Sequence, residues 1–167
     1  MADSNSPRII VAALALSAAG FVGILTREQY REQAYADPTY GWRVPTVGFG
    51  TTQGVKPGDS LKVVPAIQRA LTDASKYEGA LKQCVTVPLH QAEYDLYVNL
   101  SYNIGAAGFC GSTIVKRLNV EDYVGACNAI FLWNKSNGQD CSAPGNRTCS
   151  GLWKDRLKSH QQCMETQ

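Results

Sequence analysis

Two carboxylates in a short stretch near the start of the chain could carry acid–base chemistry. Glu28 ends a run with helical periodicity, Asp37 follows nine residues later in an Asp-Pro pair, and Thr46 opens the run Thr46-Val-Gly-Phe-Gly50. Glycoside hydrolysis needs two such acids in different surroundings, one protonated to act as the acid and one ionised to activate water or stabilise charge. The stretch therefore predicts a site that cleaves a glycosidic bond.

Each of these residues also has an alternative interpretation. Glu28 could be an ordinary surface residue late in a helix, and Glu32, one turn further on, competes with it for the acid role. Asp37 before Pro38 is typical of a turn cap. Thr46 could be present only for its β propensity.

The bulk composition restricts the class of protein. The 167 residues predict one domain of ordinary size, and a hydrophobic fraction of 44% is enough for a core. A net charge of +2 with 18% charged residues excludes a polybasic nucleic-acid arm and an acidic disordered tail. We expect no nucleic-acid partner and a monomer.

The six cysteines predict three disulfides in an oxidising compartment. They show no Cys-x-x-Cys spacing, and His90 and His160 are the only histidines, which argues against a zinc site; we expect no metal and no cofactor. Cys141 and Cys149 bracket a turn-rich loop, so they are predicted to pair. Three pairings remain open for the other four residues, which are Cys84, Cys110, Cys127 and Cys163.

The N-terminal segment, residues 9–25, contains seventeen uncharged residues after Arg8. This length is at the lower limit for a membrane-spanning helix, and eight of the residues are Ala, Gly or Ser, so insertion would be weak. It could be a cleaved signal peptide, a permanent anchor, or an anchor that later leaves the bilayer. The helical pattern continues without a break to Arg31, so residues 1–25 are predicted as an export or anchor segment and 26–167 as the catalytic domain.

The rest of the chain predicts an α+β fold with its sheet in the N-terminal third. Residues 39–52 combine Gly, Pro, Thr and aromatics as in a small antiparallel hairpin or a three-stranded patch. Helical spacing follows, with Ile67, Leu71, Ala74, Tyr77 and Leu81 on one face of the first helix. The expected helices cover residues 61–83, 87–103, 112–118, 119–133 and 150–160, the second of them central to the core. A groove between the sheet lobe and the helical lobe is the expected place for a polymer substrate.

From Leu25 to His160 the sequence resembles the phage-type lysozymes, the muramidases of glycoside hydrolase family 24. The first matching motif runs from Glu28 through Ala34-Tyr-Ala-Asp37 and Gly41 to Thr46-Val-Gly-Phe-Gly50. The second is the stretch from Gln91 to Asn103-Ile-Gly105 with Gly111-Ser-Thr-Ile, and the third is Trp133 with Gly151-Leu-Trp-Lys-Asp-Arg156. Three motifs in order make the resemblance specific.

The resemblance implies roles for individual residues. Glu28 would be the general acid, Asp37 the ionised partner, and Thr46 a ligand of the attacking water. It also implies inversion, which needs roughly 6.5–9.5 Å between the two carboxyl groups. Asn103 could contact sugar or cap its helix, and Arg156 could be a cationic neighbour of Glu28 or a solvated helix residue.

Two departures from the family pattern stand out. The family usually places its Thr six residues after the Asp, where this chain has Arg43; Thr46 is preferred because Val-Gly-Phe-Gly follows it, at the cost of a three-residue insertion. The family's last motif usually has two adjacent arginines, whereas here Asp155 precedes Arg156.

The N-terminal segment resembles the signal-anchor-release helix of some endolysins. That likeness implies export to the host periplasm, initial association with the inner membrane, and release by refolding of the helix onto the domain. Activation by a thiol within the anchor is excluded because no cysteine precedes Cys84.

The expected function is that of a phage endolysin, a lysozyme that cleaves the β-1,4 bond between N-acetylmuramic acid and N-acetylglucosamine in peptidoglycan strands. The alternatives are a lytic transglycosylase and a non-catalytic wall-binding module.

Overall fold

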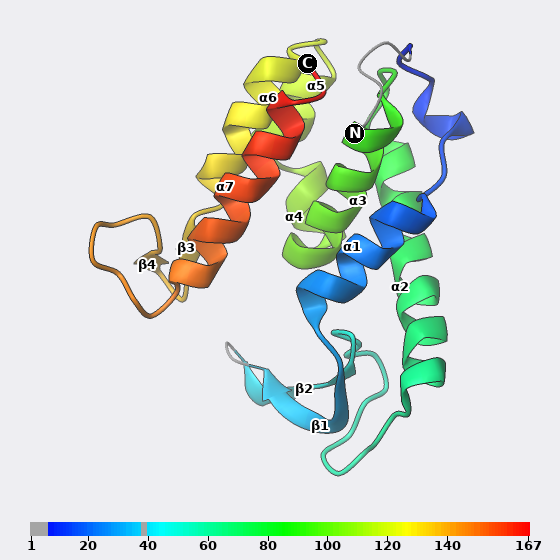
Figure 1. The fold of residues 1–167 in the computed structure, drawn as a ribbon, viewed down its shortest axis with the longest axis vertical. Coiled ribbons are helices and arrows are strands. Elements are labelled where there is room, and N and C mark those ends of the chain that lie inside the picture. Colours follow the sequence, from blue (N-terminus) through cyan, green and yellow to red (C-terminus); the bar gives the residue numbers. More distant parts are fainter. Residues whose placement is uncertain (1–6, 38–39) are drawn as a thin grey trace.

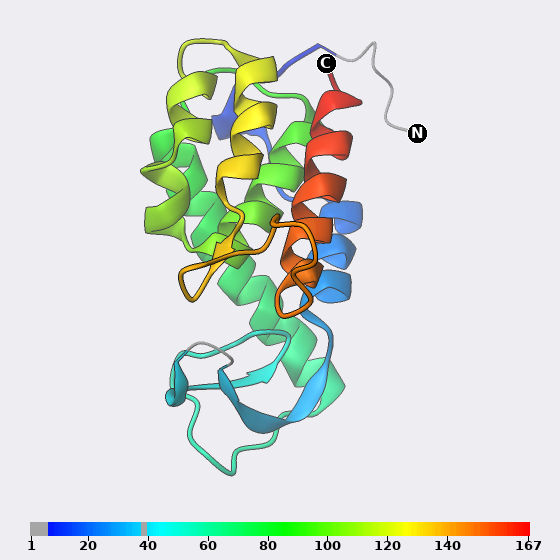
Figure 2. The same cartoon turned by 90° about the vertical axis from the view of Figure 1, so that its left-hand side faces the viewer.

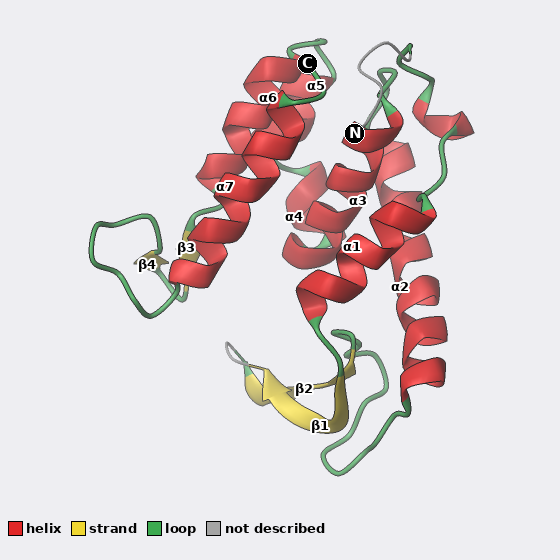
Figure 3. Cartoon of the chain, viewed as in Figure 1, coloured by secondary structure: helices red, strands yellow, loops and turns green. Residues whose placement is uncertain are grey.

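The computed structural model describes residues 7–37 and 40–167 and shows a helical lobe joined to a small sheet lobe (Figures 1 and 3). This arrangement confirms the predicted α+β class. Residues 1–6 of the predicted export segment lie outside the described residues. The described elements are η1 (Val11–Ala13), α1 (Ala18–Glu28), β1 (Arg31–Asp37), β2 (Gly41–Gly48), α2 (Val63–Cys84), α3 (Gln91–Ile104), α4 (Ala106–Cys110), α5 (Thr113–Leu118), α6 (Tyr123–Ala129), η2 (Ile130–Leu132), β3 (Lys135–Ser136), β4 (Gln139–Asp140) and α7 (Ser150–Met164).

The sheet lobe is built on the antiparallel pair β1 and β2. Tyr35 lies opposite Thr46, and Ala36 lies opposite Pro45. A small apolar cluster beneath the pair is formed by Phe49 with Ala66 and Ala70 of α2, with further apolar residues packed around it. Only the second strand of this hairpin, β2, lies in the predicted range 39–52; the first strand, β1, lies entirely before it, at Arg31–Asp37.

Helix α3 lies at the centre of the helical lobe, as predicted, and packs against α1, α2, α4 and α7. Its side chains Tyr94, Tyr97, Val98 and Leu100 are fully buried. Both views show α2 leading from the sheet lobe into the helical lobe, and the C-terminus at the end away from the sheet (Figures 1 and 2).

The buried face of α2 differs from the prediction at Leu71, which is 52% exposed. Alanines occupy the inner face instead, because β2 approaches α2 closely: a Cβ on Gly48 would lie 3.1 Å from the Cβ of Ala66. The buried residues of α2 are Ala66, Ala70, Ala74 and Leu81.

Several helix boundaries also differ from the predictions. Helix α3 begins at Gln91, after the His90 N-cap, and not at residue 87. Residues 105–111, predicted as a break, contain the short helix α4, and α7 continues past residue 160 to Met164. The helix expected over residues 119–133 begins only at Tyr123, where Asp122 caps α6 by accepting a hydrogen bond from Gly125 N at 2.9 Å, and it gives way to η2 after Ala129.

The N-terminal segment does not form the single helix that its periodicity predicts. Ile9 forms an antiparallel bridge with Leu89, and α1 begins only at Ala18. The helix ends at Glu28 because Gln29 takes a positive φ of 58°, and the chain continues as β1. Pairing with β2 thus overrides the helical pattern that extends to Arg31.

Polar groups of α2 and α3 hold this segment against the domain. Ser17 donates from its backbone N to Asp95 Oδ1 at 2.9 Å and from Oγ to Asp95 Oδ2 at 2.5 Å, while Leu16 N donates to Glu78 Oε1 at 2.7 Å. Helix α1 approaches so closely that a Cβ on Gly20 would lie 2.6 Å from Asp95 Cγ. Among the described residues, no helix is both long and apolar enough to cross a bilayer. The segment's buried apolar residues are Val11, Leu14 and Ile24.

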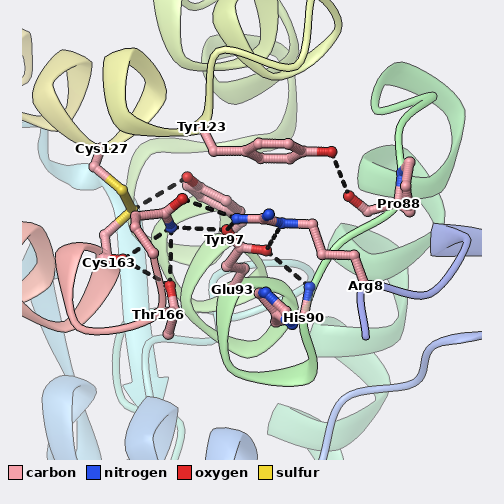
Figure 4. A network of polar contacts seen from close by, with 10 residues as sticks. Arg8, Pro88, His90, Glu93, Tyr97, Tyr123, Cys127, Cys163 and Thr166 are labelled. Carbon is pink, nitrogen blue, oxygen red and sulfur yellow. Dashed lines mark hydrogen bonds and ion pairs between the residues drawn. A yellow bond between two sulfur atoms is a disulfide. The ribbon is translucent and has the colours of Figure 1, made fainter. Parts of the chain in front are cut away.

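A buried ion pair precedes the segment (Figure 4). Arg8 donates to both carboxylate oxygens of Glu93, at 3.1 and 2.9 Å, and lies 3.7 Å from the centre of the Tyr123 ring. Glu93 is 0% exposed and also accepts from His90 N and from Gln167 Nε2, each at 2.8 Å. The N-terminal segment is therefore anchored to α3 and to the last residue of the chain.

Three disulfides are formed, which confirms the predicted number and the Cys141–Cys149 pair. The other two, which the sequence left open, are Cys84–Cys110 and Cys127–Cys163. The first joins α2 to α4, and the second joins α6 to α7. The predicted loop between residues 134 and 148 also contains the short pair β3 and β4.

Candidate functional site

Four of the five predicted site residues line one open cleft of about 810 Å³ at the junction of the two lobes. Glu28 comes from the end of α1, Asp37 from β1, Thr46 from β2 and Asn103 from α3. The remaining lining residues are Tyr35, Tyr40, Gly50, Thr52, Gln53, Asp73, Lys76, Tyr77, Tyr102, Ile104, Gly105 and Leu152.

Glu28 is placed where its carboxyl group resists ionisation. Burial raises its pKa from 4.5 to about 7, with Arg27 lowering it and Asp155 raising it by their charges. As the last residue of α1, Glu28 also meets the negative end of the helix dipole. Gly50 leaves room for it: a Cβ there, at a φ of 83°, would lie 3.0 Å from Glu28 Oε2.

Asp37 lies at the end of β1 and accepts a hydrogen bond from Tyr40 N at 2.7 Å. The turn-cap interpretation of this residue is therefore correct, while its neighbour Pro38 lies outside the described residues. The cap does not remove Asp37 from the cleft, which it lines together with Glu28. Capping fixes the carboxylate at the edge of the sheet.

Thr46 is 4% exposed, and its Oγ1 donates to Val44 O at 3.3 Å. Arg43, which stands at the usual family position of the Thr, is exposed and donates to Tyr40 O. Of these two positions, Thr46 lines the cleft and Arg43 does not. Both the catalytic and the β-propensity interpretations of this residue are compatible with its place in β2.

Arg156 does not line the cleft but lies behind it. It is 2% exposed, so the interpretation as a solvated helix residue is wrong. Its guanidinium donates to Asn103 Oδ1 at 2.7 Å and to Trp133 O at 3.0 Å. Arg156 thus holds the side chain of Asn103 in place at the cleft.

Glu32, the competitor of Glu28, lies in β1 and pairs with Lys62 at 2.6 Å on the surface. Its side chain is 40% exposed, and it is absent from the cleft lining. The position of Glu32 therefore does not support an acid role.

Sequence reasoning missed a polar group on the α2 side of the cleft. Asp73 accepts from Thr51 Oγ1 at 2.7 Å and from Lys76 Nζ at 2.9 Å, and Lys76 also donates to Gln53 Oε1 at 2.8 Å. The spacing of residues 73, 76 and 77 places them on one helix face, a signal that could have found them. Within residues 7–37 and 40–167, no group of three or more His, Cys, Asp or Glu side chains is arranged to hold a metal ion.

Comparison with known proteins identifies the fold and the family. The family model described as phage lysozyme matches residues 26–164. The endolysin of Salmonella phage P22 is 32% identical over 130 residues, which cover 75% of this chain and 86% of that protein. The SAR-endolysin of Pseudomonas phage phiKMV is 33% identical over 150 residues, 89% of this chain and 88% of that protein.

A solved endolysin structure has the same fold as this chain. The endolysin from Escherichia coli O157:H7 phage FAHEc1 superposes with a TM-score of 0.75 at 29% sequence identity, covering 93% of this chain and 96% of that one. Residues 26–164, which the family model matches, include all four of the predicted residues that line the cleft. The chain therefore belongs to the phage lysozyme family.

Proposed function

We propose that the protein is a phage endolysin that hydrolyses the β-1,4 bond between N-acetylmuramic acid and N-acetylglucosamine in peptidoglycan and thereby lyses the host cell. Membership of the phage lysozyme family supports a peptidoglycan-lytic function. The observation that carries the finer proposal is a Glu28 carboxyl group with a pKa of about 7 in the same cleft as Asp37 and Thr46.

The proposed reaction uses these three residues in sequence. Glu28 donates its proton to the glycosidic oxygen as the bond to the anomeric carbon breaks. Asp37, ionised, and the hydroxyl of Thr46 hold a water molecule that attacks the anomeric carbon from the opposite face. The water proton passes to Asp37, and each cleaved bond consumes one water and leaves one new reducing end of inverted configuration.

Asn103 would bind the sugar chain beside the reacting bond. Because its Oδ1 accepts from Arg156, its amide nitrogen remains a donor for a sugar oxygen. An open cleft, rather than an enclosed cavity, suits a polymer whose strands continue in both directions. The substrate is therefore an internal bond of the glycan strand.

Analysis of the products tests the proposal against its two alternatives. Digestion of purified peptidoglycan is expected to release muropeptides with ordinary reducing ends, each with one water added. A 1,6-anhydro product would instead identify a lytic transglycosylase, which uses one acid and no water-holding aspartate. Binding to peptidoglycan without any loss of turbidity would identify a wall-binding module.

We also propose export to the periplasm with initial attachment to the inner membrane through the N-terminal segment. The similarity to the SAR-endolysin of Pseudomonas phage phiKMV supports this, and the docked segment has the arrangement expected after release. Fractionation of host cells should find full-length protein first in the membrane and later in the soluble fraction. A soluble chain shortened by about twenty residues would show cleavage in place of release.

A further inference from the structure

Asp155 lies between two guanidinium groups, those of Arg27 and Arg156. Its Oδ1 lies 2.9 Å from Nη2 of Arg27, and its Oδ2 lies 2.5 Å from Nη1 of Arg156. The side chains of Arg27, Asp155 and Arg156 are 16%, 27% and 2% exposed. Partial burial strengthens such ion pairs and makes an unpaired charge at this place costly.

The other partners of the two guanidinium groups carry no charge. Arg27 donates to Asn99 O and Ser159 Oγ, each at 3.1 Å. Arg156 donates to Trp133 O and Asn103 Oδ1. In the described part of the chain, Asp155 is therefore the carboxylate that forms ion pairs with both arginines.

This arrangement bears on Glu28, because Arg27 is its neighbour in the chain. We propose that Asp155 is a positioning residue: by pairing with Arg27, the residue next to Glu28 in α1, it shields the Glu28 carboxyl group from that positive charge and so supports its role as proton donor. The inference rests on the proposed function of Glu28. It assigns a role to the position at which this chain departs from the paired arginines of its family.

The direction of the electrostatic effects agrees with this assignment. After burial, which is the largest cause, the charge of Arg27 lowers the pKa of Glu28 and the charge of Asp155 raises it. Without Asp155, the partly buried charge of Arg27 would stand next to the acid with no compensating carboxylate, and Arg156 would lose its ion pair. Glu28 would then lose its proton at a lower pH and leave the acid form over more of the working range.

The other titratable groups around Glu28 do not replace Asp155. The phenols Tyr35, Tyr77 and Tyr102 face it from β1, α2 and α3, and burial raises the pKa of each, so they remain neutral. Asp73 and Lys76 in the cleft lining pair with each other. The negative charge of Asp37 would disfavour ionisation of Glu28, as that of Asp155 does. Asp37 is kept in all the variants described below.

The test is the pH dependence of kcat/KM for peptidoglycan in charge variants. Asp155→Asn is expected to move the alkaline limb, which reports loss of the Glu28 proton, to lower pH by about one unit. Arg27→Gln is expected to move it to higher pH, and the double variant to return it towards the parent. Asp155→Glu, which keeps the charge, should retain most of the parental profile.

Carbon-13 NMR titration of the Glu28 carboxyl group in the same variants gives a readout that does not depend on activity. Reduced activity in Asp155→Asn with an unshifted limb and an unshifted Glu28 titration would mean a purely structural role and would overturn the inference. If Asp155→Asn does not fold, an unshifted titration in Arg27→Gln overturns it equally. An active Glu28→Gln protein would instead overturn the proposed function itself.

Discussion

Replacement of Glu28 by glutamine is expected to lower the rate of peptidoglycan hydrolysis by a factor of roughly 10² to 10⁴. The amide has nearly the same shape but has no acidic proton to give to the leaving sugar oxygen. Glu28 lines the cleft with Asp37 and Thr46, so its loss removes the only donor that the proposed mechanism uses. The measurement is turbidity loss of purified cell walls, with product quantification at matched enzyme concentration.

Glu32→Gln is the matched control for this experiment. Glu32 is four residues away in the chain but pairs with Lys62 on the surface, so this variant should retain near-parental activity. Full activity in Glu28→Gln, or loss of activity in Glu32→Gln alone, would contradict the assignment.

The stability of Glu28→Gln gives a second check on the same carboxyl group. The pKa of Glu28 is raised from 4.5 to about 7 in the folded protein. Below pH 4.5 the group is protonated in both the folded and the unfolded state and does not change the free energy of unfolding. Between pH 4.5 and about 7 it ionises more readily in the unfolded state, so it lowers the free energy of unfolding increasingly over this range. The variant should therefore match the parent in melting temperature at pH 4 and exceed it at pH 8. A lower melting temperature at both values would indicate a damaged fold instead of a lost proton donor.

Replacement of Arg8 by methionine is expected to lower the free energy of unfolding by about 3 kcal/mol, because it leaves the charge of Glu93 buried without its cation. Glu93 is 0% exposed, whereas Arg8 is 26% exposed. Because one partner is partly solvated, we expect a loss of stability at the low end of the range for breaking a buried ion pair. Chemical denaturation of the variant and the parent measures this difference.

Two further variants identify the cause of that loss. Adding Glu93→Gln to Arg8→Met should recover part of the stability, since no buried charge then remains. Lys62→Met, which breaks the exposed pair with Glu32, should cost at most about 1 kcal/mol. Equal losses in Arg8→Met and Lys62→Met would mean that the Arg8–Glu93 pair does not hold the N-terminal segment in place.

The elements of the site that the sequence predicted are those set by local spacing. Glu28 at a helix end, Asp37 at a turn and Thr46 at the start of a short run needed only the neighbouring residues to be recognised. The Cys141–Cys149 pair was predictable for the same reason, because the two cysteines are only eight positions apart in the chain.

The features that sequence reasoning missed depend on contacts between distant segments. The helical pattern extends to Arg31, the first residue of β1, but the pairing of β1 with β2 decides the structure of this segment. The ion pair between Asp155 and Arg27 joins α7 to α1, so the motif alone could not show what the departure from paired arginines does. The sequence of the N-terminal segment is apolar enough to enter either a membrane or a protein core. In the folded domain it packs against α3, and the close contact of Gly20 with Asp95 could not be recognised from the sequence.

The most direct measurement of the central claim is a carbon-13 NMR titration of the Glu28 carboxyl group in the intact protein. Our account predicts a midpoint at a pH of about 7, so that the group is largely protonated and able to act as an acid in mildly acidic to neutral conditions. A midpoint near the ordinary value of 4.5 would contradict it, because Glu28 would then be ionised and unable to donate a proton.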